Sequence, residues 1–159
     1  MKKNGFTLME LLVAVIIMTM LITMAIPLYE KTVEKSRATE ARALLKKITD
    51  SKQRLLLSME LDSWDTVPTA FSANSLDVST PGTANGTGAA ATLTTKYFTY
   101  KFFPTGAHNK VCASRKSGDT AGVAFWYEPG SGGGTFTCTG EAEKCAIYGM
   151  VASNTNACN

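Results

Sequence analysis

The feature that most constrains this chain is a near-continuous apolar segment close to its N-terminus. Residues 11–28, LLVAVIIMTMLITMAIPL, contain no charged side chain, and one carboxylate, Glu10, stands directly before them. Counted from Phe6, the segment is long enough to cross a hydrocarbon core of about 30 Å as a helix that rises about 1.5 Å per residue. An acid carried to the edge of such a segment is costly, which indicates that Glu10 has a role and a partner.

A secretory signal peptide is the first alternative for this segment, because it also begins with basic residues. The apolar run here is longer than the usual signal core, and no convincing A-x-A cleavage site follows it. A transmembrane helix fits better, and Lys2 and Lys3 before it favour an N-terminus that stays in the cytoplasm. A simple anchor still does not explain the pattern G-F-T-L-M-E at residues 5–10.

The stretch KKNGFTLME, residues 2–10, followed by a long apolar helix, resembles the class III signal of type IV pilins and pseudopilins. The resemblance implies that residues 1–5 are a leader peptide and that a membrane enzyme, the prepilin peptidase, cuts between Gly5 and Phe6. It also implies that the same enzyme methylates the new amine of Phe6. Pro27 falls where family members often carry a helix-kinking proline, whereas Met9 occupies a position that is more often aliphatic.

The resemblance gives Glu10 an assembly role. Cleavage creates a charged amine at Phe6, and two opposite buried charges cost less together than apart. In the family this glutamate is held to neutralise the amine of a neighbouring subunit during filament assembly, and Thr7 can add a hydrogen bond at the same helix end. The alternative is an intramolecular pair between Glu10 and its own Phe6 amine, which one helical turn permits.

The helix is predicted to continue to residue 61 and to change character after residue 28. Residues 6–28 form the transmembrane and assembly half, and residues 29–61 form an amphipathic half that seeks a sheet. Pro27 removes one backbone donor and is expected to kink or loosen the helix near Thr23. The apolar residues of the second half recur at steps of three and four: Val33, Ala41, Leu44, Leu45, Ile48, Leu55, Leu56 and Met59.

The rest of the chain is predicted to be a loop followed by a sheet. Residues 62–92 are rich in Ser, Thr, Ala, Gly and Asn and are expected to form a long irregular connection. Residues 93–159 are expected to form an antiparallel sheet of about four strands, LTTKYFTYKFF, KVCASRK, AGVAFWYE and TFTCTG, with EKCAIYGM as a last strand or an irregular segment. The predicted class is therefore α+β, a long N-terminal helix packed on an antiparallel sheet, as in pilins.

Four cysteines, Cys112, Cys138, Cys145 and Cys158, all lie behind the apolar segment. An even count there predicts disulfides and an oxidising compartment. Cys138–Cys145 with Cys112–Cys158 is one pairing, and Cys112–Cys138 with Cys145–Cys158 is its rival. The resemblance implies a disulfide-bounded C-terminal region, although usually with two cysteines.

The sequence predicts a structural protein and not an enzyme. It shows no phosphate loop or acidic metal cluster, and His108, its only histidine, has no partner in its segment, so no cofactor and no metal are expected. The aromatic and basic run at residues 96–101 is interpreted as core packing, and no specific nucleic-acid partner is predicted.

The function predicted from these features is that of a prepilin. The chain waits in the inner membrane with its N-terminus in the cytoplasm, meets the prepilin peptidase and the inner-membrane assembly platform, and polymerises with other pilin subunits into an extracellular filament for adhesion, motility or DNA uptake. A pseudopilin of a type II secretion system and a monomeric membrane-anchored adhesin are the alternatives.

Overall fold

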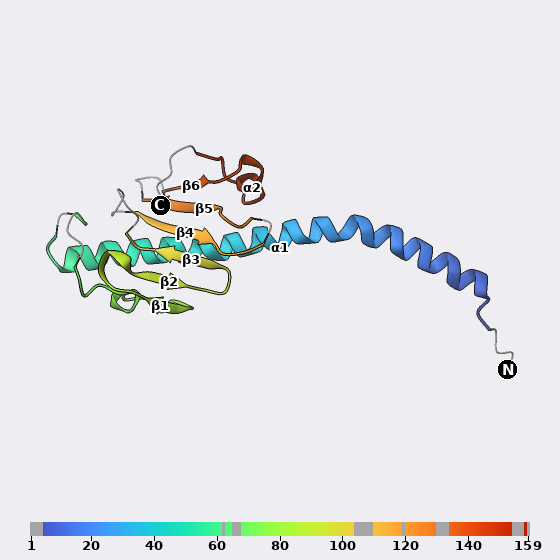
Figure 1. Ribbon diagram of the computed structural model, residues 1–159, viewed down its shortest axis with the longest axis horizontal. Coiled ribbons are helices and arrows are strands. Elements are labelled where there is room, and N and C mark those ends of the chain that lie inside the picture. The colour runs from blue at the N-terminus through green and yellow to red at the C-terminus, as the bar shows by residue number, and fades with distance from the viewer. Residues whose placement is uncertain are drawn as a thin grey trace. The chain divides into compact units, whose positions relative to one another are not determined.

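The computed structural model describes residues 5–61, 63–64, 68–103, 110–118, 120–129, 134–153 and 158. The chain divides into two compact units, Met1–Glu34 and Lys35–Asn159. One helix, α1 (Leu8–Ser58), contributes residues to both units (Figure 1). The predicted α+β class, a long N-terminal helix with an antiparallel sheet, is confirmed.

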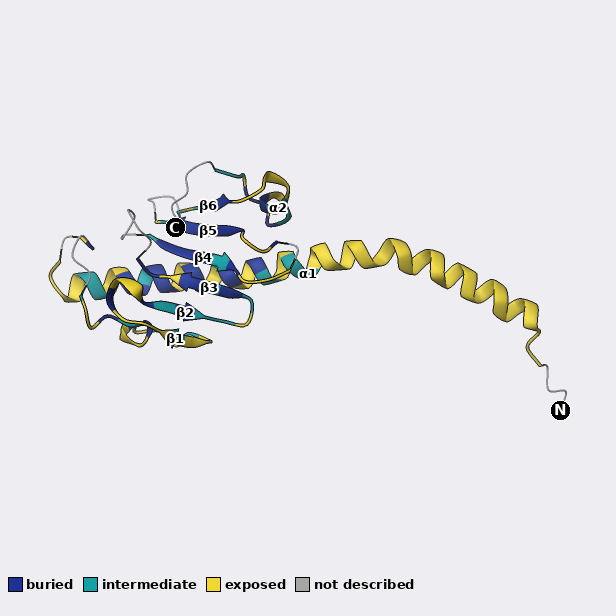
Figure 2. Cartoon of the chain, in the orientation of Figure 1, coloured by how far each residue is buried: buried dark blue, intermediate teal, exposed yellow. Residues whose placement is uncertain are grey.

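In the first unit, α1 exposes apolar side chains in every direction. All residues from 5 to 32 are exposed, as the unbroken yellow of this stretch shows in Figure 2. The helix continues through Pro27 without interruption. The hydroxyls of Thr19 and Thr23 donate to the carbonyls of Ile16 and Met20, both at 2.8 Å, which keeps these polar groups satisfied inside the helix.

The second unit contains one antiparallel sheet in which six strands follow one another in chain order (Figure 1). The prediction of about four strands was therefore too low. The strands are β1 (Thr83–Asn85), β2 (Thr92–Thr94), β3 (Phe98–Lys101), β4 (Val111–Arg115), β5 (Ala124–Glu128) and β6 (Thr135–Thr139).

One added strand comes from a hairpin inside LTTKYFTYKFF, which the sequence predicted as a single strand. The chain reverses at Lys96 and Tyr97, and Thr94 of β2 pairs with Thr99 of β3. Thr95 closes the turn: its amide donates to the Phe98 carbonyl at 2.8 Å, and its hydroxyl accepts from the Phe98 amide at 3.1 Å. The backbone amide and the side chain of Thr95 therefore supply the turn hydrogen bonds in a stretch that has no glycine.

The other added strand, β1, lies in the segment predicted as an irregular loop. Gly86 follows it with φ +69°, and a Cβ at this position would lie 2.6 Å from the Ala90 carbonyl oxygen, so the turn requires glycine. The amide of Gly88 donates to the Phe71 carbonyl at 2.8 Å. Trp64, Phe71 and Leu76 of the segment predicted as a loop are buried.

The core forms where one stripe of α1 packs on one face of the sheet. Figure 2 shows this stripe as the dark blue surface of α1 beside the strands. The core contains Ala38, Ala41, Leu44, Leu45 and Ile48 of α1. From the strands it contains Leu93, Phe98, Tyr100, Val111, Ala113, Phe125, Tyr127 and Cys138. The opposite face carries a smaller cluster of Cys112, Ala124, Trp126 and Cys158. Side chains alternate along β3, because Phe98 and Tyr100 are buried and Lys101 is exposed.

Asp77 fastens the segment after residue 70 to α1. The Arg54 guanidinium donates to both carboxylate oxygens, from Nε at 2.7 Å and from Nη2 at 2.8 Å. The Ser51 hydroxyl donates to the same carboxylate. These hydrogen bonds, with the one from Arg54 contributing most, hold the pKa of Asp77 well below its usual range.

Two disulfides close the C-terminal region, Cys138–Cys145 and Cys112–Cys158. The structure thus contains the first of the two pairings considered from the sequence. Residues 143–150, EKCAIYGM, were predicted as a strand or an irregular segment, but most of them belong to the short helix α2 (Ala142–Ile147). Its buried Cys145 is joined to Cys138 of β6 across only 7 residues of sequence, which leaves room for a tight reversal and not for a further strand.

Lys52 is the one lysine in the buried stripe of α1, and it is 1% exposed. Its Nζ donates to the carbonyls of Phe102 at 2.6 Å and Lys110 at 3.3 Å. The same nitrogen lies 4.1 Å from the ring centre of Phe103 and 5.2 Å from that of Trp64. Burial lowers the pKa of Lys52 to about 7.

This burial predicts a pH dependence of stability. An unfolded lysine titrates near pH 10.4, so between about pH 7 and pH 10 the unfolded chain holds more protons than the folded chain and the free energy of unfolding rises with pH. We expect the native chain to gain stability relative to Lys52→Met across this range, by at most about 1.4 kcal/mol per pH unit. Denaturant unfolding in detergent at a series of pH values measures it.

Lys47→Met is the matched control, because Lys47 is exposed on the same helix. The stability difference between the native chain and this variant should stay flat with pH. A flat difference for Lys52→Met as well would show that the buried amine titrates like an exposed one.

Candidate processing and assembly site

The predicted cleavage bond lies in an extended, open stretch before α1. Gly5, Phe6 and Thr7 precede the helix, and Phe6 is 84% exposed. A Cβ built on Gly5 would meet nothing within 4 Å. Among the described residues, the bond between Gly5 and Phe6 is therefore open to an enzyme from all sides.

Thr7 and Glu10 form a reciprocal cap at the start of α1. The Thr7 amide and hydroxyl donate to Oε2 of Glu10 at 3.1 Å and 3.0 Å. The Glu10 amide in turn donates to the Thr7 hydroxyl oxygen at 3.3 Å. This is a capping box, in which the side chains at the N-cap and at the third helical position satisfy each other's backbone donors.

The cap leaves part of the Glu10 carboxylate available. Both donors from Thr7 use Oε2, and in residues 5–61 and the other described parts of the chain Oε1 has no hydrogen-bond partner. A carboxylate oxygen accepts charge-assisted hydrogen bonds from an ammonium group. The arrangement can therefore hold the helix end and receive one amine at the same time.

The structure brings together two of the residues that the sequence singled out, Thr7 and Glu10. Pro27 lies about five helical turns further along α1 and contacts neither of them. The resemblance assigned Thr7 a single added hydrogen bond, whereas the structure shows a mutual cap of Thr7 and Glu10. The pattern T-x-x-E directly before an apolar run, residues 7–10, is the signal that predicts it.

The described residues contain no group of three or more His, Cys, Asp or Glu side chains that could hold a metal ion. His108, the single histidine, lies outside them. Among the same residues, α1 is the one helix that is long and apolar enough to cross a membrane, by length and composition.

Comparison with known proteins gives one match. The model of the family described as Prokaryotic N-terminal methylation motif matches residues 1–26, which hold Gly5, Phe6, Thr7 and Glu10. The chain therefore begins with the class III signal of type IV pilins and pseudopilins, and this motif supports a protein of that class. With the apolar helix that follows, it fits a membrane-anchored precursor that the prepilin peptidase processes. No curated protein and no solved structure matches the chain.

The capping box predicts a specific effect of Thr7 substitutions. Thr7→Val keeps the shape of the side chain but removes both hydrogen bonds of the hydroxyl, which should cost about 1 kcal/mol. We expect backbone amides of the first turn of α1 to exchange with solvent roughly fivefold faster in this variant. Hydrogen exchange followed by NMR on the full chain in detergent micelles measures the change.

Thr7→Ser is the control, because serine caps helices at least as well as threonine. Its exchange rates should match those of the native chain. Equal rates for Thr7→Val and Thr7→Ser would show that the hydroxyl does not hold this helix end.

Proposed function

We propose that this chain is the precursor of a type IV pilus subunit. It is cut between Gly5 and Phe6, methylated at Phe6, and polymerised through α1 with further copies into an extracellular filament. The observation that carries the proposal is the pairing of an accessible Gly5–Phe6 bond, inside the matched methylation motif, with a helix whose residues 8–28 are all exposed and almost all apolar.

The exposed surface of α1 supports membrane residence followed by assembly. An apolar helix surface of this length needs lipid or other apolar helices around it, because each large aliphatic side chain gains about 1.5–3 kcal/mol when it leaves water. In the membrane, lipid covers it, and in a filament the same surface of neighbouring subunits covers it. A repeated head-to-tail contact that does not close produces a filament.

In this proposal, Glu10 supplies the polar interaction that favours contact between subunits. Apolar helices gain little by exchanging lipid for one another, because lipid tails are as apolar as leucine. In contrast, a charged amine at Phe6 and a carboxylate at Glu10 are stabilised when they meet, since each offsets the lost hydration of the other. The free Oε1 of Glu10 is suited to receive the amine of a neighbouring subunit.

A pseudopilin of a type II secretion system is the second candidate, since the same motif occurs in both groups. The two share processing and helix assembly and differ in where the filament ends. The proposed pilus predicts long filaments in sheared surface fractions, whereas a pseudopilus predicts short ones that stay within the envelope.

The processing step predicts a defined mature N-terminus. When the full chain is produced together with a prepilin peptidase, intact-mass and N-terminal peptide analysis should find a chain that begins at Phe6 and carries one added methyl group. Production without the peptidase is the control and should leave Met1 or Lys2 at the N-terminus. A chain that keeps residues 1–5 in the presence of active peptidase would contradict the processing proposal.

The assembly step can be separated from helix capping by two substitutions of Glu10. Glutamine at this position still completes a capping box but carries no charge, whereas leucine removes both functions. If neutralisation of the Phe6 amine drives assembly, Glu10→Gln and Glu10→Leu should both insert into the membrane and both lose filaments. Immunoblots of membrane fractions and electron microscopy of sheared filaments measure the two properties.

Normal filament yield from Glu10→Gln with loss in Glu10→Leu would contradict neutralisation and assign the role of Glu10 to the helix cap. Normal yield from both variants would remove Glu10 from the assembly mechanism altogether.

A further inference from the structure

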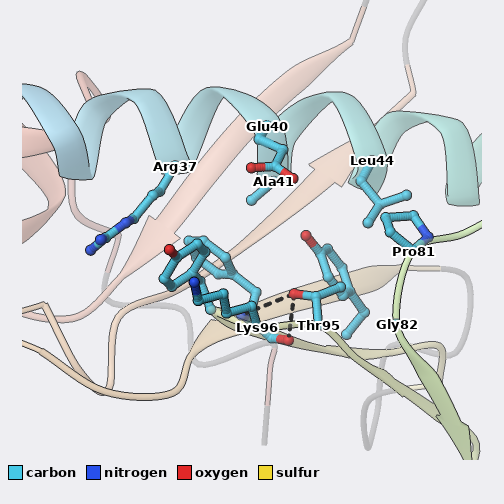
Figure 3. Close-up of a pocket in the computed structure, with 11 residues that line it drawn as sticks. Arg37, Glu40, Ala41, Leu44, Pro81, Gly82, Thr95 and Lys96 are labelled. Atoms are coloured by element: carbon cyan, nitrogen blue, oxygen red, sulfur yellow. Dashed lines mark hydrogen bonds between the residues drawn. The ribbon is translucent and has the colours of Figure 1, made fainter.

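Two hollows border α1 within the second unit. The first has a volume of about 210 Å³, and Figure 3 shows Arg37 and Glu40 of α1 on one side of it and Lys96 on the other. Tyr100 also lines it. The Arg37 guanidinium lies 4.3 Å and the Lys96 amine 5.2 Å from the ring centre of Tyr97. The cations of this first hollow therefore already have an aromatic partner.

The second hollow is a groove of about 560 Å³ beside β6. Phe136 and Thr137 of β6 line it on the strand, residues 149–153 line it after α2, and Arg42 reaches it from α1. Apolar side chains form much of this lining, and one of them, Val151, is 87% exposed. The groove therefore combines an apolar surface with a single cation.

The Arg42 guanidinium is incompletely partnered in this groove. Its Nη2 donates to the Tyr148 carbonyl, and its central carbon lies 5.6 Å from the ring centre of Phe136. Its Nε is buried without a hydrogen-bond partner, and no carboxylate of the described residues forms an ion pair with it. Burial lowers the pKa of Arg42, as expected for a cation without a counter-charge. An added carboxylate would supply that charge.

β6 is the last strand of the sheet (Figure 1), so one of its edges has no neighbouring strand. Only its C-terminal end is covered: Cys138 forms a parallel bridge with Ala152, and the Ser153 amide donates to the Cys138 carbonyl at 2.8 Å. Along a strand of an antiparallel pair, residues whose amide and carbonyl face the partner alternate with residues whose groups face away. The Cys138 carbonyl faces away from β5, so the amide and carbonyl of Phe136 do too, and no described residue bonds them there.

The free part of this edge is closed at one end. A chain that paired with Phe136 and continued along β6 would meet residues 152–153, which occupy the edge beside Cys138. An added strand therefore has to end before Cys138. The charge of Arg42 selects which end of the strand fits, because it attracts a terminal carboxylate and repels a terminal amine.

We propose that this groove binds the C-terminal end of an extended peptide chain of another protein. The peptide backbone adds to β6 at Phe136 and runs parallel to it, the terminal carboxylate pairs with Arg42, and the last apolar side chain packs against Phe136 and Val151. Strand addition gives affinity through main-chain hydrogen bonds, and side-chain pockets give specificity. An amide and a carbonyl on one residue are the pattern that a peptide backbone completes, which favours a peptide over a small carboxylic acid.

The site belongs to the second unit, and none of its residues takes part in the proposed cleavage or in the Glu10 contact. Loss of peptide binding would therefore leave the proposed function intact.

The test uses the full chain, isotope-labelled and in detergent micelles, titrated with a pool of acetylated pentapeptides Thr-Val-Thr-x-x in which x is Ala, Val, Leu or Ile. The same pool with C-terminal amides is the matched control. We expect saturable shifts of the backbone amide signals of Phe136, Thr137 and Val151 with the free acids, and binding about tenfold weaker with the amides. Equal binding of the two pools, or no saturable shift at these signals, overturns the proposal.

A second copy of this chain is the rival occupant of the groove. It would shift the same three amide signals when the protein is concentrated without peptide, and the free acids would fail to compete. That result overturns a peptide of another protein as the occupant.

Strand addition is tested on the tightest peptide of the pool by methylation of one backbone nitrogen at a time. Of two neighbouring nitrogens in an added strand, only one faces β6. Methylation of that nitrogen should weaken binding about tenfold, and methylation of its neighbour should leave binding unchanged. Equal effects at both nitrogens would overturn pairing with Phe136.

Two substitutions of Val151 test the carboxylate without disturbing the core, because this side chain is exposed. Val151→Glu places a like charge at the groove and should weaken binding of the free acids about tenfold, whereas Val151→Lys should leave it unchanged or tighter. Equal effects of the two substitutions would overturn the placement of the carboxylate.

Arg42→Gln should remove the preference for free acids over amides, since it deletes the cation. Lys47→Gln is the control for net charge, because Lys47 is exposed on the same helix. A preference that persists in the Arg42 variant, or that is lost equally in the Lys47 variant, would overturn the role of Arg42. The unfolding midpoint of each variant is measured alongside, and the Val151 pair decides the case if Arg42→Gln fails to fold.

Discussion

The exposed apolar surface at the start of α1 is the constraint on which the behaviour of this protein depends. Residues 8–28 point large aliphatic side chains in every direction, and the described part of the chain covers none of them. Such a surface is stable only in lipid or among other apolar helices. Because these two environments are nearly equivalent for an apolar side chain, the choice between them falls to the few polar groups at the helix end. In the proposed filament Thr7 and Glu10 are those groups, and their mutual cap leaves one carboxylate oxygen of Glu10 without a partner among the described residues.

In the second half of the same helix, basic side chains bind backbone carbonyls and a carboxylate of other segments. Lys52 enters the core and holds two backbone carbonyls, whereas Arg54 binds both oxygens of Asp77 at the surface. The Arg42 guanidinium donates to the carbonyl of Tyr148, just after α2. These cations fasten strands and loops that are far away in sequence to one helix, so the sheet depends on α1 for polar anchoring as well as for hydrophobic cover. A stripe of aliphatic residues alone would hold the sheet against α1 but would not hold the loops.

Much of this fold could be predicted because its signals are local. The steps of three and four residues between Ala41, Leu45 and Ile48 define a buried helix face, and the alternation of Phe98 and Tyr100 defines a strand face. The hairpin at Lys96 and Tyr97 could not be found in this way, because the alternation continues across it and neither residue is a typical turn former. The helix α2 was missed for a related reason, since a disulfide loop and not periodicity determines its conformation.

The sequence by itself determined the membrane-length segment, the match of residues 1–26 to the methylation motif, and the T-x-x-E cap, because each depends on residues within a few positions of one another. Only the tertiary structure decided which cysteines pair, that Lys52 is buried, and that Arg37, Glu40 and Lys96 share one cavity with Tyr100. These outcomes depend on strand register and on the turn that folds β3 back along β2. Neither is encoded in a short stretch, because both follow from how the whole sheet packs against α1.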